Sequence, residues 1–313
     1  MTNLTHLRLG ASLYVPAVRE DLVEVALAQK LANARSVIFC TEDSVSESDL
    51  PQALENLRHM LPRARRSSSR MLFIRPRNPK VLYQLLEMPG IENIDGFVLP
   101  KATAYSMPQY LGQLSHAEFG TLPPFWLMPT LETREVFDPH QMRQLMEVML
   151  RPGVRERILV LRIGGNDLLN VLGVRRSRQR TLYESPLGPT IANLVTMFKP
   201  EGFHLTSPVC ELLYDHEVLQ RELALDVEHG LVGKTAIHPD QVAIIEQAYR
   251  PVEQDVQMAE AILADNAPAV FNMHGTMCEV ATHHEWAQQV LARRQLYGVY
   301  GKKAAPVRLA EAA

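Results

Sequence analysis

Charged side chains follow several apolar runs of this sequence at positions where they could act together. Glu132 ends the run PFWLMPTLE, and Asp167 comes two residues after the run RILVLRIGG. Two acids, Glu42 and Asp43, follow SVIFCT, and Arg75 lies within MLFIRPR. Taken singly, Glu132 could be an acid at a helix entry and Asp167 could cap a helix. Taken together, they suit a hard cation such as Mg2+, which takes one or two protein carboxylates and completes its shell with water and substrate oxygens.

The arginines and glycines near these acids could bind a substrate. Arg75 and Arg77 are two residues apart, so they point to one side if the strand continues that far. Either could hold a substrate carboxylate through both nitrogens of its fork, and Arg75 is preferred because Arg77 could equally sit in a turn. Gly164 and Gly165 let the backbone bend or approach a ligand closely, although a plain turn would use them too.

A second basic run, 175–180, follows the sixth apolar run and reads RRSRQR. Such a run is usually a solvated surface. Because it follows a strand end that we expect on the active face, it could equally bind the phosphate of a substrate or of an acyl carrier. Both interpretations stay open at this point.

Eight short apolar runs alternate with longer amphipathic stretches along the chain. The runs are rich in Val, Ile, Leu and Phe, as strands buried on both faces are. They cover residues 11–17, 36–42, 71–77, 96–102, 124–132, 157–165, 202–208 and 234–239. The helical patterns between them include 19–32, 49–61, 79–88 and 140–151. This alternation predicts an α/β fold of the TIM (β/α)8 barrel class, which places functional residues at the C-terminal ends of its strands.

The chain is expected to continue beyond the barrel. Residues 1–245 are predicted to form the catalytic barrel, and 246–313 an additional C-terminal helical extension. Within the tail, 240–265 and 279–295 read as helices, with an extended break at 268–276. Asp49 and Asp138 are predicted helix N-caps. The basic segment 62–70 is expected to be a solvated loop.

Composition excludes several classes of function. The 313 residues are 46% hydrophobic and 21% charged, with a formal net charge of −3. A protein with this net charge is not expected to bind nucleic acid or an anionic membrane by overall electrostatic attraction. No signal segment and no apolar stretch of about 20 residues is apparent, so we expect a cytoplasmic protein. The three cysteines, Cys40, Cys210 and Cys278, are far apart and are expected to be reduced.

Seven motifs in order along the chain resemble the citrate lyase β-subunit-like aldolase family, as in a divergent member. They are SLYVPA, TEDSV, IRPRN, VLPKA, LET, GGNDLLNVLG and GKTAIHPDQV, which together cover roughly residues 8–245. The resemblance implies a barrel, Mg2+ or a similar divalent cation, and reversible cleavage of 3-hydroxyacids or their CoA thioesters. It implies that Glu132 and Asp167 hold the metal, that Arg75 binds the substrate carboxylate, and that Glu42 and Asp43 are the family's acidic pair. It also implies a trimer or hexamer whose C-terminal segment covers a neighbour's site.

The sequence departs from the family pattern at three places. Cys40 and Thr41 stand where the family has Asp and Leu, and Asn166 stands where a Glu is common. Pro76 and Arg77 stand where a single apolar residue and Asn are usual.

The function predicted from these residues is Mg-dependent retro-aldol or retro-Claisen cleavage of a small 2-oxo or 3-hydroxy acid, or of its CoA thioester. Glu42 or Asp43 would assist proton transfer. The alternative is a pseudoenzyme that binds metal and a small acid as a sensor or assembly partner. A third interpretation keeps the barrel and condenses an enolate with a sugar phosphate held by the arginines of the run 175–180.

Overall fold

The computed structural model describes residues 4–67, 69–118, 122 and 124–301, and these residues form a parallel β-barrel with an arm. The sheet order is β7-β6-β5-β4-β3-β2-β1-β8, and every pairing within it is parallel. A parallel bridge between Ser207 and Lys234 joins the two ends of the sheet. The strands are β1 (Gly10–Pro16), β2 (Ser36–Cys40), β3 (Met71–Arg75), β4 (Gly96–Leu99), β5 (Trp126–Leu131), β6 (Leu161–Ile163), β7 (Leu205–Thr206) and β8 (Gly233–Ala236). The predicted TIM barrel is confirmed.

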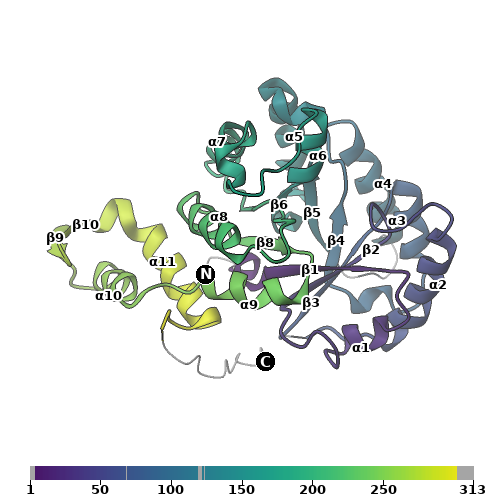
Figure 1. Ribbon diagram of the computed structural model, residues 1–313, viewed down its shortest axis with the longest axis horizontal. Coiled ribbons are helices and arrows are strands. Elements are labelled where there is room, and N and C mark those ends of the chain that lie inside the picture. Colours follow the sequence, from purple (N-terminus) through teal and green to yellow (C-terminus); the bar gives the residue numbers. More distant parts are fainter. Residues whose placement is uncertain (1–3, 68, 119–121, 123, 302–313) are drawn as a thin grey trace.

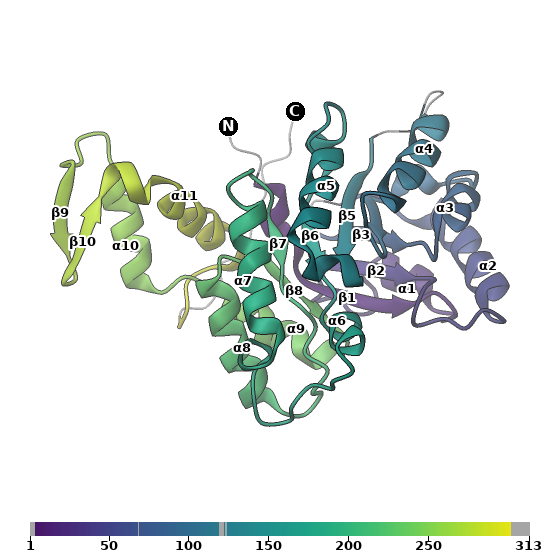
Figure 2. The ribbon, with the colours of Figure 1, turned by 90° about the horizontal axis from the view of Figure 1, so that it is seen from above.

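Helices surround this sheet (Figure 1, Figure 2). They are α1 (Leu22–Ala26), α2 (Leu50–Met60), α3 (Pro79–Leu86), α4 (Ser106–Glu118), α5 (Pro139–Met149), α6 (Gly165–Val171), α7 (Leu187–Phe198), α8 (His216–Glu228) and α9 (Pro239–Ala248). Short 3-10 helices lie at Thr5–Leu9 (η1), Leu61–Arg63 (η2), Ile91–Asn93 (η3), Arg134–Phe137 (η4), Arg155–Arg157 (η5) and Leu182–Glu184 (η6). Strands β2, β3 and β4 are buried along their whole length, because the helical layer covers their outer face and side chains fill the inside.

Helix α1 is much shorter than the predicted helix over 19–32. The chain leaves the helix after Ala26, and Ala28 and Leu31 take positive φ angles of 59° and 54°. The buried guanidinium of Arg70 donates to the carbonyl groups of Val25, Lys30, Leu31 and Ala34. These bonds give hydrogen-bond donors to carbonyl groups in and after the interrupted helix. Arg70 also shows that the segment 62–70 is not entirely a solvated loop.

Of the two predicted N-caps, the structure forms one. The Asp138 carboxylate accepts a hydrogen bond from the amide of His140 at 2.8 Å, one residue into α5. Asp49 makes no cap bond to α2, because its carboxylate accepts from the Ser46 hydroxyl at 2.6 Å instead.

The C-terminal region forms an arm beside the barrel. The predicted helix over 240–265 is two helices, α9 and α10 (Glu253–Ile262), separated around Pro251. The extended break is an antiparallel hairpin, β9 (Val270–Met273) with β10 (Thr276–Glu279), followed by α11 (Val280–Tyr297). Figures 1 and 2 show α10, the hairpin and most of α11 extending away from the barrel. Helix α9 packs against β1 and β8, so the barrel layer continues past the predicted boundary at 245. Among the described residues no helix is long and apolar enough to cross a membrane.

Candidate active site

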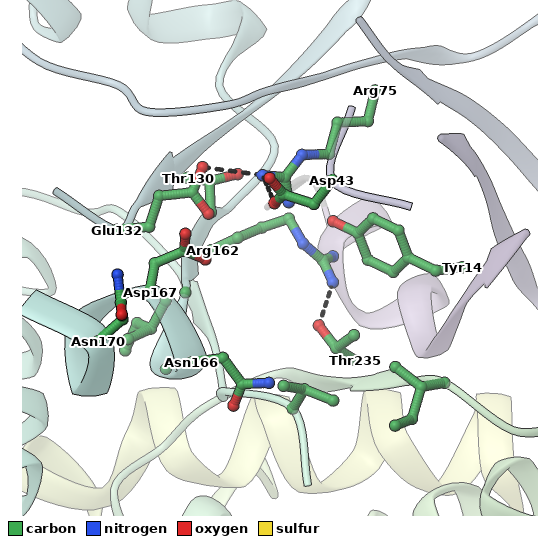
Figure 3. Close-up of a pocket in the computed structure, with 15 residues that line it drawn as sticks. Tyr14, Asp43, Arg75, Thr130, Glu132, Arg162, Asn166, Asp167, Asn170 and Thr235 are labelled. Atoms are coloured by element: carbon green, nitrogen blue, oxygen red, sulfur yellow. Dashed lines mark hydrogen bonds and ion pairs between the residues drawn. The ribbon is translucent and has the colours of Figure 1, made fainter. Parts of the chain in front are cut away.

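A cavity of about 390 Å3 opens where the barrel strands end (Figure 3). Its walls come from β1, β3, β5, β6 and β8, from residues just after β2 and β7, and from α6. The C-terminal ends of parallel strands meet on one face of a barrel, so residues distant in sequence converge there. The lining residues include Tyr14, Asp43, Arg75, Thr130, Glu132, Arg162, Asp167 and Thr235.

The two predicted metal-binding carboxylates both line this cavity. Glu132 follows β5 directly and is 3% exposed, and Asp167 lies in the first turn of α6. Gly164, between them, has no Cβ atom, and a Cβ there would lie 2.7 Å from Glu132 Oε2 and closer still to Glu132 Cβ. The glycine therefore allows the end of β6 to approach the Glu132 side chain.

The electrostatics of these carboxylates fit a bound cation. Burial raises the pKa of Glu132 to about 7, and the charge of Asp167 adds to that rise although Arg75 opposes it. Burial also raises the pKa of Asp167, together with the charge of Asp43. No group of three or more His, Cys, Asp or Glu suited to a metal occurs among the described residues. Two desolvated carboxylates are nevertheless enough for Mg2+, because the rest of its shell is water and substrate oxygen.

Arg75 is surrounded by acids. Its Nη2 atom lies 2.7 Å from Glu42 Oε2, 3.1 Å from Asp43 Oδ2 and 2.9 Å from Glu132 Oε1. Burial acts to lower the pKa of the guanidinium, but the charges of Tyr14, Glu132 and Glu42 hold it above its usual range. The Nε atom of Arg75 is buried without a hydrogen-bond partner in the described part of the chain, so one donor is left for a ligand.

Lys101 provides a second cation on this side of the cavity. Its Nζ atom pairs with Glu42 and lies 3.5 Å from Asp43 Oδ1, while its amide donates to Glu132 Oε1 at 2.8 Å. Lys101 takes a left-handed backbone with φ of 51°, a strained conformation for a residue with a Cβ atom and one common at functional sites.

The acidic pair after β2 divides into a buried and an open member. Glu42 is buried and lies outside the cavity lining, and desolvation raises its pKa. Asp43 lines the cavity with 56% of its side chain exposed. Burial acts to raise the pKa of Asp43, but the hydrogen bond with Glu42 and the charges of Arg75 and Lys101 lower it overall. Asp43 is therefore the member of the pair that is kept ionised and open to a ligand.

The structure does not bring Arg77 to the cavity. Its guanidinium donates to the backbone carbonyls of Thr41, Glu42 and Val45, and so holds the loop after β2. Arg75 and Arg77 were expected to point to the same side of one strand. This expectation is wrong, because β3 ends at Arg75 and Arg77 lies beyond it. Of the two arginines, only Arg75 remains a candidate for substrate binding.

The two glycines after β6 differ in their surroundings. Both Gly164 and Gly165 line the cavity, but a Cβ on Gly165 would meet Pro208 Cβ at 2.7 Å rather than a catalytic group. Asn166, which replaces an acid of the family pattern, also lines the cavity. Cys40 is buried at the end of β2, where its Sγ accepts from the amide of Glu42 at 3.4 Å.

Arg162, Tyr14 and Thr235 line the cavity although the sequence argument did not select them. Arg162 lies inside an apolar run, RILVLRIGG, and not beyond its end. A signal was present, because a charged residue in a run otherwise expected to be buried on both faces needs a partner or a ligand. The Arg162 guanidinium carbon lies 5.6 Å from the centre of the Tyr14 ring, and Arg162 Nη2 donates to Thr235 Oγ1 at 2.6 Å.

The basic run 175–180 is partly structural. The side chain of Arg176 is buried and forms an ion pair with Glu222, with Nη1 2.5 Å from Oε2. Arg175, Arg178 and Arg180 are exposed. The anion-binding interpretation is therefore wrong for Arg176, and it stays a prediction for the exposed arginines.

Lys234, from the motif GKTAIHPDQV, lies behind the barrel wall rather than in the cavity. Its Nζ atom lies 3.0 Å from both Glu222 Oε1 and Asp226 Oδ2 of α8. The Tyr183 hydroxyl donates to Asp226 at 2.6 Å, and Arg176 completes the charge balance. This cluster joins β8 to α8 and takes no part in the cavity.

Comparison with known proteins places the fold and these motifs in one family. A family model described as C-C bond lyase of the TIM-barrel fold matches residues 3–299. The chain belongs to this family. It is thus a carbon–carbon lyase, and its low identity to the relatives below marks a divergent member. Two (3S)-malyl-CoA thioesterases of Cereibacter sphaeroides are similar to it: one is 26% identical over 80% of this chain and 81% of its own length, the other 25% identical over 92% and 95%.

Solved structures share the architecture. CitE from Mycobacterium tuberculosis, in complex with magnesium, acetoacetate and coenzyme A, superposes with a TM-score of 0.66 at 21% identity. That match covers 91% of this chain and 98% of CitE. A citrate lyase from Burkholderia xenovorans gives a TM-score of 0.73 at 18% identity, over 95% and 94% of the two chains. At sequence identities this low, the similarity to these structures shows that the fold is shared.

Proposed function

We propose that this lyase cleaves a carbon–carbon bond of a small 2-oxo or 3-hydroxy acid, or of its CoA thioester, by a Mg2+-dependent retro-aldol or retro-Claisen reaction. The observation that carries the proposal is the pair Glu132 and Asp167, two desolvated carboxylates on one cavity with Gly164 between them. CitE, a structural neighbour, is solved with magnesium, acetoacetate and coenzyme A, and two relatives are malyl-CoA thioesterases, so CoA thioesters are among the candidate substrates.

The roles of the chain's own residues follow from their contacts. Glu132 and Asp167 would hold the ion, and a bound Mg2+ supplies positive charge that stabilises the enolate oxygen as the carbon–carbon bond breaks. Arg75 keeps Glu132 and the acidic pair in place through its Nη2 atom, and its unpartnered Nε can bind a substrate carboxylate.

Proton transfer is assigned to Asp43 rather than to Glu42. Asp43 is ionised and lines the cavity, so its carboxylate can accept the proton of a substrate hydroxyl when cleavage begins. Glu42, buried between Arg75 and Lys101, positions these two cations.

The direct test is an assay of purified protein with Mg2+ against oxo- and hydroxyacids, including malyl-CoA. We expect Glu132→Gln and Asp167→Asn each to lower kcat/KM by about 100-fold or more and to weaken Mg2+ binding in calorimetric titrations. The matched control is Glu147→Gln, which removes a carboxylate from the exposed surface of α5. Unchanged activity and Mg2+ affinity in both site variants would contradict the assignment.

The alternative, a pseudoenzyme that binds metal and a small acid, is favoured by one observation. Asn166 supplies a neutral amide at the cavity where the family pattern has an acid. Stabilisation of the fold by Mg2+ with an oxoacid, without turnover of any compound in the panel, would support this alternative.

A further inference from the structure

A row of polar side chains crosses the inside of the barrel on three neighbouring strands. Thr130 of β5 is in register with Arg162 of β6, and Arg162 is in register with Thr206 of β7. Residues paired in register point to the same side of a sheet, so the three side chains lie next to one another. All three are buried, with exposures of 3%, 2% and 1%. Barrel interiors are ordinarily packed with branched apolar residues, so this row needs a reason.

The row has unused hydrogen-bonding capacity. Thr130 Oγ1, Arg162 Nη1 and Thr206 Oγ1 are all buried and have no hydrogen-bond partner in the described part of the chain. Each such atom costs free energy unless a ligand or water satisfies it. Thr130 and Arg162 also line the cavity, so a ligand there can reach them.

No acid forms a close ion pair with Arg162 in the described part of the chain. No carboxylate of the described residues pairs with its guanidinium within 4.0 Å, whereas Arg75 has three such partners. A guanidinium stays protonated in proteins, and a buried charge without a counter-ion is strongly unfavourable. An anion bound in the cavity would remove this cost.

The position of Arg162 separates it from the proposed metal site. Figure 3 shows its side chain extending across the cavity toward Thr235 and Tyr14, with Glu132 and Asp167 on the other side. The bond from Nη2 to Thr235 Oγ1 fixes one arm of the fork and leaves Nη1 free. A substrate held at Glu132 and Asp167 by one end could therefore reach Arg162 with its other end.

We infer that Arg162, with the Thr130 hydroxyl beside it, binds a second carboxylate of the substrate, so that the cavity takes a small dicarboxylic hydroxy- or oxoacid. The inference deepens the proposed function. It rests on that function only in placing the first end of the substrate at Glu132 and Asp167. The Arg162 fork donates to the carboxylate, and Thr130 adds a hydroxyl donor that has no other partner in the described structure.

The test compares two ligands that differ in one group. (S)-Malate and (S)-2-hydroxybutyrate share the 2-hydroxyacid end, and a methyl group replaces the second carboxylate in the latter. Calorimetry with the full chain at a fixed Mg2+ concentration should give tighter binding of malate by about 10- to 100-fold. Arg162→Gln should abolish this preference and leave the affinity for 2-hydroxybutyrate unchanged. Arg162→Lys should retain part of the preference, because it keeps the charge and loses the fork.

Arg134→Gln is the matched control, because it removes a positive charge from an exposed position just after β5. It should keep the preference for malate. The unfolding midpoint of ligand-free Arg162→Gln should not fall, because the variant removes an unbalanced buried charge, whereas loss of a purely structural arginine would lower it.

Equal affinities of the unaltered protein for the two acids, no measurable binding of malate, or a preference that survives in Arg162→Gln would each overturn the inference. If malate binds through Arg162 but no compound is cleaved, the proposed function fails and the subsite stands.

Discussion

Gly164 lies against the Glu132 side chain, and this close approach leaves no room for a Cβ atom. Its φ of −88° is accessible to any residue, so alanine is compatible with the backbone, and the three atoms nearest to its Cβ would all belong to Glu132. We expect Gly164→Ala to displace the carboxylate and to weaken Mg2+ binding at least about tenfold, measured by calorimetry. Gly112→Ala is the control, because a Cβ at Gly112 in α4 meets nothing within 4 Å. Equal Mg2+ affinities of the two variants would show that Glu132 does not need its present position.

His204, just before β7, predicts a pH dependence of stability. Its ring stacks on His6 with centroids 3.5 Å apart, and burial, aided by the charges of Lys199 and Arg155, lowers its pKa to about 4. The unfolded chain binds this proton near pH 6.5, so the unfolded state gains protons first as the pH falls. Stability from this group is therefore present above pH 6.5 and is lost between about pH 6.5 and 4.

The measurement is urea unfolding of the unaltered protein and of His204→Phe at pH 7 and pH 5. Between these pH values the unaltered protein should lose about 2 kcal/mol more than the variant. The difference between the two proteins is the quantity to compare, because buried acids such as Glu132 have raised pKa values and act with the opposite sign. Identical losses would contradict the assignment to His204.

At the residue scale, the sequence could locate the acids of the cavity but not all of its cations. Glu132, Asp167, Asp43 and Arg75 line the cavity as expected from their places at strand ends. Arg162 was missed because a single sequence does not tell which face of a three-residue strand meets the cavity. That depends on the register between β5, β6 and β7, which the closed barrel sets.

Between β8 and α8, the buried ion cluster makes a prediction about stability. Lys234 is fully enclosed between Glu222 and Asp226, so its loss leaves Asp226 without a cation and leaves Glu222 paired with Arg176 alone. We expect Lys234→Met to lower the free energy of unfolding by about 3–5 kcal/mol, measured with urea. The control is Lys30→Met, which removes a lysine from an ion pair with Asp21 in which the lysine side chain is 53% exposed. That change should cost less than about 1 kcal/mol.

A substitution in helix α4 is expected to raise the free energy of unfolding, in contrast to Lys234→Met. Gly112 lies in the middle of the helix, and it is exposed. Glycine costs more backbone entropy on folding than alanine, so Gly112→Ala should raise the free energy of unfolding by about 0.5–1 kcal/mol. A lower free energy of unfolding in Gly112→Ala would contradict the prediction, because a Cβ at this position meets nothing within 4 Å in the structure.

At the element scale, hydrophobic periodicity located the strands and most helices but not where tertiary contacts interrupt a helix. Each of the eight predicted strands overlaps an observed one, because burial on both faces leaves a strong apolar run in the sequence. The helix expected at 19–32 ends after Ala26, where the distant Arg70 takes over carbonyl groups. No local pattern records such a contact. The break at Pro251 could have been predicted, because proline removes a donor and disfavours a helical residue before it.

Across the whole molecule, the barrel and the arm have separate apolar cores. Val256, Ile262, Cys278 and Val290 belong to a cluster inside the arm, formed by α10, the hairpin and α11. The arm is attached at the end of α11, where Arg35 donates to the carbonyl of Leu296 at 2.8 Å. The Arg35 guanidinium also lies 4.9 Å from the centre of the Tyr297 ring. An arm with its own core can keep its shape while extending away from the barrel.

The outer face of the hairpin carries the prediction about assembly. Val270 and Met277 are 55% and 59% exposed, and the strand pairing puts both on the face opposite Phe271 and Cys278. Large apolar side chains left in water on a projecting element are typical of a contact with another chain. We therefore expect a homo-oligomer in sedimentation velocity experiments, and the family resemblance predicts that it is a trimer or hexamer.

Val270→Ser combined with Met277→Glu should shift the protein toward a smaller species, because both apolar contacts are lost and a charge is introduced into the interface. Leu150→Glu, which adds the same charge at an apolar barrel residue that is 39% exposed, should leave the sedimentation coefficient unchanged. Circular dichroism of the double variant checks that the arm keeps its helices. A monomeric unaltered protein would contradict the prediction, and so would a double variant that sediments with the unaltered oligomer, since the hairpin face would then not be the contact between subunits.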